Sequence, residues 1–195
     1  MITQTKPQYY TPEEYLALEE KADCKHEYRD GKIITMTGGT TNHNKIAGNF
    51  YSYLRFALKG QKYDTYIGDV RLWISQYRLY TYPDVMVINE QPIYHGKGRT
   101  TVTNPCLIAE ILSKSTQNYD QGEKFRFYRS LPTFQEYLLI PQDYVSIMHY
   151  TKTTEGHWLL QEYENKKEII QLKSLPLEIN IQDFYEGVNF AETEE

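Results

Sequence analysis

The sequence reads YPDVMVI at residues 82–88 and LIAEILS at residues 107–113. Both stretches are short apolar runs rich in Val and Ile, a pattern typical of buried β-strands. Each run carries a single acid, Asp84 in the first and Glu110 in the second. A carboxylate inside a buried strand is costly unless it is paired or bound to a metal. We therefore interpret these two acids as carboxylates that converge on one divalent cation.

A third stretch, DQGEKFRFY at residues 120–128, has the composition of a helix. Asp120 stands where an N-cap is expected, so we predict a helix from Asp120 to about Arg129, with orientation of the site as a second role for Asp120. Lys124 in this helix could bring a cation to the two carboxylates. The alternative is an exposed lysine that pairs with Asp120 one helical turn earlier.

The chain has 195 residues, the length of one domain with small additions. We expect a flexible N-terminus at residues 1–10, one domain at residues 11–188 and an acidic tail at residues 189–195. The 19 tyrosines favour a sheet-rich fold and are compatible with an interface between copies.

The net charge of −5 gives no overall attraction to nucleic acid, although it does not exclude a local basic patch. Cys24 and Cys106 are too few for a disulfide framework or a zinc site, which indicates free thiols in a reducing compartment. The N-terminus lacks an apolar signal core, and no apolar run approaches the ~20 residues that span a bilayer. These features predict a cytoplasmic protein without a membrane segment.

The N-terminal part reads as a helix, a hairpin and a second helix. Residues 11–14, Thr-Pro-Glu-Glu, are a helix start with a capping residue and an early proline. Residues 25–37 read as a β-hairpin around the Asp-Gly pair at 30–31, a strong signal for a tight turn. Thr41 or Asn42 is expected to cap an amphipathic helix. We expect His43 at its N-terminal end, on the inward side.

The rest of the chain reads mainly as strands. Residues 63–74 look like one extended segment in which Asp69 and Arg71 share a face as an ion-pair ladder. After the helix near residue 124, further strands are predicted at residues 136–140, 145–150, 158–163 and 168–172. The order of elements predicts an α+β fold, a mixed central sheet flanked by helices, with additional antiparallel strands toward the C-terminus.

Asp84 and Glu110 are hard oxygen ligands, suited to Mg²⁺ or Mn²⁺ rather than to zinc. Magnesium usually takes one or two protein carboxylates and completes its octahedron with water and substrate phosphate. A nearby lysine such as Lys124 could orient or deprotonate a water molecule, or stabilise the transition state of phosphoryl chemistry.

The chain resembles the Uma-two family, formerly a domain of unknown function, within the PD-(D/E)XK nuclease superfamily. The order and spacing of several features carry the resemblance over about residues 11–150: EYRDGKI at 27–33, His43, YPDV at 82–85, EILS at 110–113, Ser115, Thr116, Asp120, Lys124, Tyr128, Glu136 and Tyr137.

The resemblance implies a restriction-endonuclease-like core and Mg²⁺-dependent cleavage of DNA phosphodiester bonds. It implies that Asp84 and Glu110 are metal ligands, with the backbone carbonyl of Ile111 as a third. The lysine of the superfamily should stand two residues after Glu110, where this chain has Leu112. We therefore assign the catalytic lysine to Lys124 on the following helix.

Several alternatives stay open at this point. Glu27 either completes the acid cluster or pairs with a basic residue of its hairpin, and His43 is either a substrate or supporting residue of the site or a satisfied buried histidine. Two active sites that cut a duplex would favour a homodimer. The alternative function is a catalytically silent nucleic-acid-binding or assembly module that keeps the fold. A third reading is a metal-dependent phosphoesterase for small nucleotides.

Overall fold

The structure, a computed structural model, describes residues 8–190. Residues 1–7 of the predicted flexible N-terminus and residues 191–195 of the predicted acidic tail lie outside the described residues. At the N-terminal end of the described residues, the backbone N–H of Tyr10 donates a hydrogen bond to the carbonyl of Gly31, and the Tyr9 hydroxyl donates to the carboxylate of Asp30.

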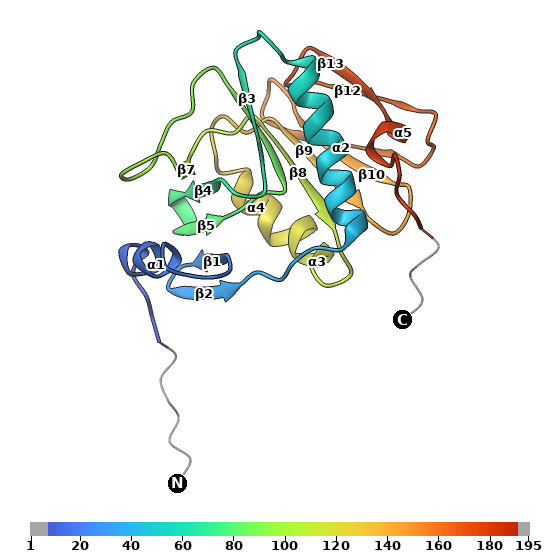
Figure 1. The fold of residues 1–195 in the computed structure, drawn as a ribbon. Helices are drawn as coiled ribbons and strands as arrows, with labels where there is room; N and C mark the ends of the chain where they lie inside the picture. Colours follow the sequence, from blue (N-terminus) through green and yellow to red (C-terminus); the bar gives the residue numbers. More distant parts are fainter. Residues whose placement is uncertain (1–7, 191–195) are drawn as a thin grey trace.

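A six-stranded mixed sheet forms the centre of the molecule (Figure 1). Its neighbouring strands are antiparallel except for one parallel pair, β8 with β9. Both strands of that pair are buried along their whole length, which fits their apolar sequences. In spatial order the strands are β11 (Trp158–Tyr163), β10 (Ile147–Lys152), β9 (Glu136–Pro141), β8 (Leu107–Leu112), β6 (Val85–Asn89) and β3 (Tyr63–Ile67).

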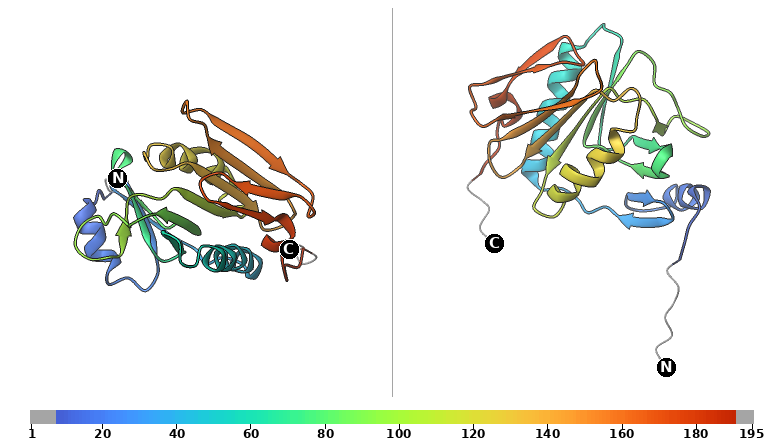
Figure 2. Two further views of the ribbon diagram at one scale, coloured as in Figure 1. Left: turned by 90° about the horizontal axis from the view of Figure 1, so that it is seen from above. Right: turned by 180° about the vertical axis from the view of Figure 1, so that it is seen from behind.

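Helices cover both faces of this sheet. Helix α2 (Thr41–Ala57) crosses one face, and a continuous helical run crosses the other (Figures 1 and 2). That run comprises α3 (Gln117–Tyr119), a π-helical segment (Asp120–Lys124) and α4 (Phe125–Tyr128). Because side chains of a strand alternate between faces, the core divides into two clusters, one under α2 and one under α4.

A second, five-stranded sheet holds the N-terminal hairpin. It comprises β2 (Lys32–Thr35), β1 (His26–Arg29), β5 (Leu79–Thr81), β4 (Arg71–Ile74) and β7 (Thr101–Val102), in that order. The hairpin turns at Asp30 and Gly31, whose φ angles of 38° and 93° explain the Asp-Gly sequence. A 3₁₀ turn at Ser75–Tyr77 joins β4 to β5. Helix α1 (Pro12–Glu19) packs on this sheet through Tyr15, and Thr11 and Glu14 form its capping box.

The C-terminal part adds a two-stranded antiparallel sheet, β12 (Ile169–Leu172) with β13 (Leu177–Asn180), and the short helix α5 (Ile181–Phe184). The mixed α+β architecture with extra antiparallel strands toward the C-terminus is confirmed. Within residues 8–190, no helix is long and apolar enough to cross a membrane. Both cysteines are free thiols, Cys24 exposed and Cys106 buried.

Two local expectations are wrong. Residues 63–74 are two strands in different sheets, separated by a turn at Gly68, which has a φ of 60°. Asp69 and Arg71 form no ladder, because the Asp69 carboxylate pairs with Lys25 at 2.9 Å and Arg71 bonds Thr100. The cap of the second helix is Thr40, one residue earlier than expected.

Candidate active site

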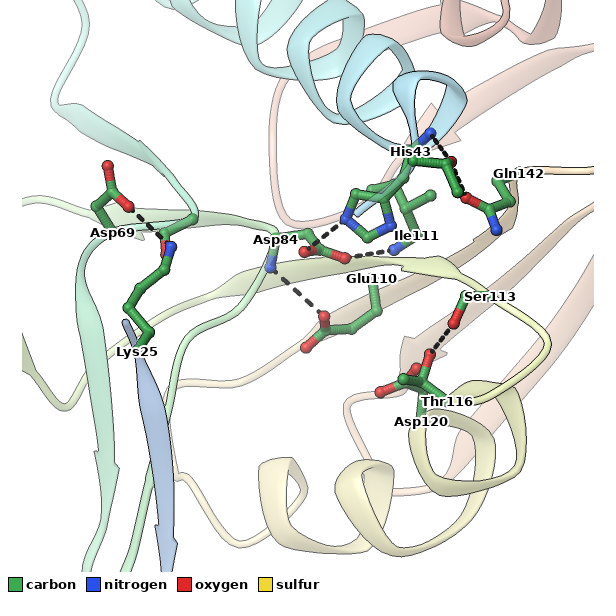
Figure 3. Close-up of polar contacts among 12 residues, drawn as sticks. Lys25, His43, Asp69, Asp84, Glu110, Ile111, Ser113, Thr116, Asp120 and Gln142 are labelled. Atoms are coloured by element: carbon green, nitrogen blue, oxygen red, sulfur yellow. Dashed lines mark hydrogen bonds and ion pairs between the residues drawn. The ribbon is translucent and has the colours of Figure 1, made fainter. Parts of the chain in front are cut away.

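The register of β6 on β8 places the two buried acids beside each other. Val85 pairs with Ala109 in this antiparallel ladder, so Asp84 and Glu110 are the next residues along the same register. The backbone N–H of Asp84 lies 3.4 Å from Oε2 of Glu110. The Glu110 carboxylate thus reaches the backbone of Asp84 just before β6 begins, at the C-terminal half of β8 (Figure 3).

Glu110 lies on the face of β8 that the α3–α4 run covers. Only 2% of its surface is exposed. Its Oε1 accepts a hydrogen bond of 2.6 Å from the Tyr128 hydroxyl and forms an ion pair of 2.9 Å with Nζ of Lys124. Since Tyr128 follows Lys124 by four residues, one turn of helix supplies both partners. Oε2 keeps acceptor capacity on the side that faces Asp84.

Lys124 is the buried cation of the site. Besides Glu110, its ammonium lies 3.3 Å from Oδ1 of Asp120 and 3.9 Å from Oε1 of Glu27. The predicted cap role of Asp120 is wrong, because the helical run already begins at Gln117 and Asp120 lies inside it. The π-helical turn from Asp120 to Lys124 places both side chains in the buried site, and such π-bulges are frequent at functional sites.

Glu27 reaches the cluster from β1 of the other sheet. Its Oε1 accepts a hydrogen bond from the Thr81 hydroxyl, and Oε2 accepts one of 3.4 Å from Tyr119. Its carboxylate also lies 3.9 Å from Arg29, two residues along the same strand. The hairpin therefore contributes one buried acid to the cluster around Lys124.

His43 and Ile111 hold Asp84 from two directions (Figure 3). Nε2 of His43 lies 3.0 Å from Oδ1 of Asp84, and the backbone N–H of Ile111 donates to Oδ2 at 2.8 Å. The N–H and C=O of a strand residue point to the same side, so the Ile111 carbonyl lies on the edge of β8 that faces Asp84. Thr40, which caps the helix at His43, also donates to Gln142 and so ties this end of α2 to β9.

The environment drives the pKa values of the two acids apart. Burial alone would raise the pKa of Asp84, but His43, Lys124 and the Ile111 N–H lower it below its usual value. Burial raises the pKa of Glu110 to about 8, because the opposing effect of Lys124 is smaller and Asp84 and Asp120 add to the rise. Paired titratable groups with divergent pKa values are typical of catalytic sites.

The same environment raises the pKa values of Lys124 and His43. Burial lowers the pKa of Lys124, but Glu110, Asp120 and Glu27 raise it well above its ordinary value. Burial also lowers the pKa of His43, and its hydrogen bond and charge interaction with Asp84 outweigh that effect. A lysine held in this way acts as a fixed positive charge and not as a base.

The donor atoms at this position suit a hard divalent cation. Across residues 8–190, no group of three or more His, Cys, Asp and Glu side chains is arranged to enclose a metal ion. The donors that could contribute are fewer: the carboxylates of Asp84 and Glu110 and the carbonyl of Ile111. Mg²⁺ is usually bound by a few protein oxygens, and water and phosphate complete its coordination shell.

All seven residues singled out in the sequence lie in this one cluster: Glu27, His43, Asp84, Glu110, Ile111, Asp120 and Lys124. Their chemical roles remain predictions. The sequence did not identify Tyr128 or Tyr119 as polar partners of the acids. A signal for Tyr128 existed, because a buried tyrosine hydroxyl needs a partner and Tyr128 shares a helix face with Lys124.

Comparison with known proteins decides the family. The sequence model of Uma2, described as "Putative restriction endonuclease", matches residues 12–182. The chain belongs to the Uma2 family. The match spans every residue of the cluster described above.

Two relatives of this chain come from Synechocystis sp. (strain ATCC 27184 / PCC 6803 / Kazusa). The uncharacterized protein sll1609 is 40% identical over 167 residues, which cover 86% of this chain and 94% of that protein. The uncharacterized protein slr1290 is 37% identical over 180 residues, covering 92% and 93%.

A solved structure shares the fold. The crystal structure of "a putative nuclease belonging to DUF820" from Anabaena variabilis ATCC 29413 superposes with a TM-score of 0.74. The match covers 91% of this chain and 98% of that one, at 20% sequence identity. At that identity the likeness concerns the fold.

Proposed function

We propose that this Uma2 protein is an endodeoxyribonuclease that hydrolyses DNA phosphodiester bonds with Mg²⁺ or Mn²⁺. The observation that carries the proposal is the meeting of Asp84 and Glu110 at one point of the sheet, with Lys124 2.9 Å from Glu110. The family description, "Putative restriction endonuclease", agrees with this chemistry.

Asp84, Glu110 and the Ile111 carbonyl would hold the metal ion. When bound, such an ion lowers the pKa of a water molecule and offsets negative charge on a phosphoryl group. Asp84 suits this role because its pKa is lowered, so that it is ionised at neutral pH. His43 orients Asp84 through Oδ1.

Lys124 serves as a protonated group. Because its pKa is raised well above the ordinary value, it donates hydrogen bonds and does not abstract a proton. It can orient the attacking water and stabilise the negative charge that develops on the phosphate. Asp120 and Glu27 hold the ammonium in position. A homodimer with two-fold symmetry belongs to the proposal, since one site per chain cuts one strand at a time.

The experiment is cleavage of a supercoiled plasmid with Mg²⁺ and with Mn²⁺ at low salt. Wild type should nick and linearise the plasmid, and a chelator should stop the reaction. Asp84→Asn, Glu110→Gln and Lys124→Ala should each lose cleavage. Acid variants that cut as well as wild type would contradict the assigned site. Turnover of small nucleotide esters with the plasmid left intact would instead favour a phosphoesterase.

One observation favours the second candidate, a catalytically silent nucleic-acid-binding or assembly module. The Oε1 atom of Glu110 already has two partners in the protein, Lys124 and Tyr128. A silent module predicts that millimolar Mn²⁺ leaves the melting temperature unchanged in both wild type and Glu110→Gln. The nuclease predicts a rise in wild type that Glu110→Gln abolishes.

A further inference from the structure

The buried cluster carries more negative than positive charge. Lys124 lies among three carboxylates, those of Glu27, Glu110 and Asp120. Lys124 itself is only 7% exposed, so it offers little positive surface to an approaching ligand. Without a bound metal ion, a DNA phosphate that approaches this region meets like charge, and a cation at the rim would offset that repulsion.

Arg29 is a cation at the rim of this cluster. It lies at the end of β1, with 28% of its side chain exposed. Its Nη2 lies 3.9 Å from Oε2 of Glu27, which connects it to the buried acids. Its Nη1 forms an ion pair of 3.2 Å with Glu123, whose side chain is 58% exposed. One partner of Arg29 is therefore buried and fixed, and the other lies in solvent.

The guanidinium group is also held in a fixed orientation. It lies over the ring of Tyr119 with 4.2 Å between the guanidinium carbon and the ring centroid. Tyr119 in turn donates to Glu27, so the ring belongs to the same cluster. Stacking of this kind pre-organises an arginine, and less entropy is lost for each hydrogen bond that it later forms.

The donors of Arg29 are incompletely used. Its Nε–H is buried and has no hydrogen-bond partner among residues 8–190. A planar guanidinium has five N–H donors, and its fork geometry matches the oxygens of a phosphate group. An exposed carboxylate pair such as Arg29–Glu123 contributes little to stability, so a phosphate can displace Glu123 at small cost.

We propose that Arg29 binds a backbone phosphate of the DNA substrate beside the active site, and that Glu123 occupies its guanidinium group when no DNA is bound. This inference rests on the proposed nuclease function and adds the residue that draws the phosphate to an acidic site. Glu123 then acts as a competitor for the phosphate and weakens binding.

The test measures binding of a labelled DNA duplex to the full chain by fluorescence anisotropy, with Ca²⁺ in place of Mg²⁺, over a series of salt concentrations. The variants are Arg29→Ala, Arg29→Lys and Glu123→Gln. Arg55→Ala is the matched control, since it removes the same charge from an exposed position on α2. Arg55 lies twelve residues after His43, about 18 Å along the helix.

Arg29→Ala should raise Kd about tenfold and reduce the slope of log K against log salt by about one, as expected when one phosphate contact is lost. Arg29→Lys should restore most of the slope, and Glu123→Gln should lower Kd. Arg55→Ala should leave both quantities near the wild-type values. A structural role alone would change the melting temperature of Arg29→Ala without changing the salt slope.

The outcomes separate this inference from the proposed function. Wild type that binds and cleaves DNA, with Arg29→Ala equal to Arg55→Ala in Kd and salt slope, overturns the role of Arg29 and leaves the nuclease assignment in place. Wild type that neither binds nor cleaves DNA overturns both. A Glu123→Gln variant that binds more weakly than wild type overturns the competitor role of Glu123.

Discussion

Glu110 on β8 and Glu136 on β9 are both buried, with 2% and 0% of their surface exposed. They lie on neighbouring parallel strands, where Glu136 pairs with Leu107 and Glu110 with Leu139. Leu107, which lies beside Glu136, is three residues before Glu110 on β8, about 10 Å along the strand. The two acids thus share their burial and their sheet, and differ in what surrounds them.

Protein donors saturate Glu136. Its Oε1 contacts Nε2 of His149 at 2.5 Å and accepts the backbone N–H of Lys173 at 2.8 Å. Its Oε2 accepts the N–H and the hydroxyl of Ser174 at 2.8 and 2.5 Å. These bonds clamp the turn between β12 and β13 onto the central sheet. A carboxylate with four protein partners has little capacity left for a ligand.

The partners of Glu110 are arranged differently. Lys124 and Tyr128 contact one oxygen, and the other faces Asp84 with a single long contact of 3.4 Å. Burial without saturation raises the pKa of Glu110 to about 8. Burial alone therefore does not identify a functional acid. The unused acceptor capacity beside a second carboxylate distinguishes Glu110 from Glu136.

The largest expected effect is on stability. Glu136→Gln should lower the free energy of unfolding by about 3 kcal/mol or more, because the buried His149 and the turn donors of Lys173 and Ser174 lose their charged acceptor. In a chain of this size that loss lowers the melting temperature by roughly 6–12 °C. Glu110→Gln should change stability by less than about 1 kcal/mol, because a carboxyl with a pKa of about 8 is mostly neutral at pH 7 and Lys124 keeps Asp120 and Glu27 as partners.

Thermal or urea unfolding of the two variants beside wild type provides the measurement. Equal losses in both variants would remove the distinction between a structural and a functional glutamate. A larger loss for Glu110→Gln would reverse it.

The second effect is the response to metal. At a Mn²⁺ concentration one hundred times Kd, wild type and Glu136→Gln should each gain about 2.7 kcal/mol, because the ion binds only the folded chain. Glu110→Gln should lose that gain, since one of the two carboxylate ligands is gone. Melting curves with and without Mn²⁺ measure this. If the stabilisation by Mn²⁺ survives in Glu110→Gln and disappears in Glu136→Gln, the metal binds at Glu136 and the assignment of Glu110 is contradicted.

A smaller effect is expected at His43. His43→Ala removes the partner of Oδ1 of Asp84 and frees the carboxylate to rotate. Loss of such an orienting residue typically weakens metal binding by about 10–100-fold. Isothermal titration with Mn²⁺ measures the affinity, and His149→Ala is the control at the Glu136 clamp. Unchanged affinity in His43→Ala would contradict the orienting role.

The smallest effect concerns the two thiols. Burial, with a further contribution from Glu136, raises the pKa of Cys106 to about 12, so at pH 8 only about one thiol in ten thousand is ionised. The folded chain should therefore alkylate at exposed Cys24 first, and Cys106 should react faster as the pH rises. Glu136→Gln should expose Cys106 to iodoacetamide more often. Mass spectrometry after timed labelling at pH 8 tests this, and rapid labelling of Cys106 in wild type would contradict it.

The sequence allowed the positions of Asp84 and Glu110 to be predicted because a single acid within an apolar strand needs a partner. The hairpin and the helix start at Thr11 followed from local turn and capping chemistry. Both kinds of signal lie within a few residues of chain. The helical stretch at residues 120–128 suggested Lys124 as a cation for the two carboxylates, and the resemblance to the family, with Leu112 in the place of the usual lysine, gave it the catalytic role.

Other features depend on contacts that local sequence does not reveal. Asp120 looked like a helix cap because the π-helical turn, which places it inside a longer helical run, has no simple sequence pattern. The clamp at Glu136 joins residues 37 and 38 positions apart in the chain, Lys173 and Ser174. Arg29 on β1 and Tyr119 on α3 lie far apart in the sequence and meet only in the folded chain.

The most direct test of Glu110 as the functional acid compares plasmid cleavage by Glu110→Gln and Glu136→Gln. The rate is measured per folded molecule, at a temperature where both variants are folded. We predict that Glu136→Gln cleaves at close to the wild-type rate in Mg²⁺ or Mn²⁺. Glu110→Gln should fall by about a thousandfold, because a metal ion supplies several kcal/mol of transition-state stabilisation. Wild-type cleavage by Glu110→Gln, or loss of cleavage by folded Glu136→Gln, would contradict the assignment of Glu110 as the functional acid.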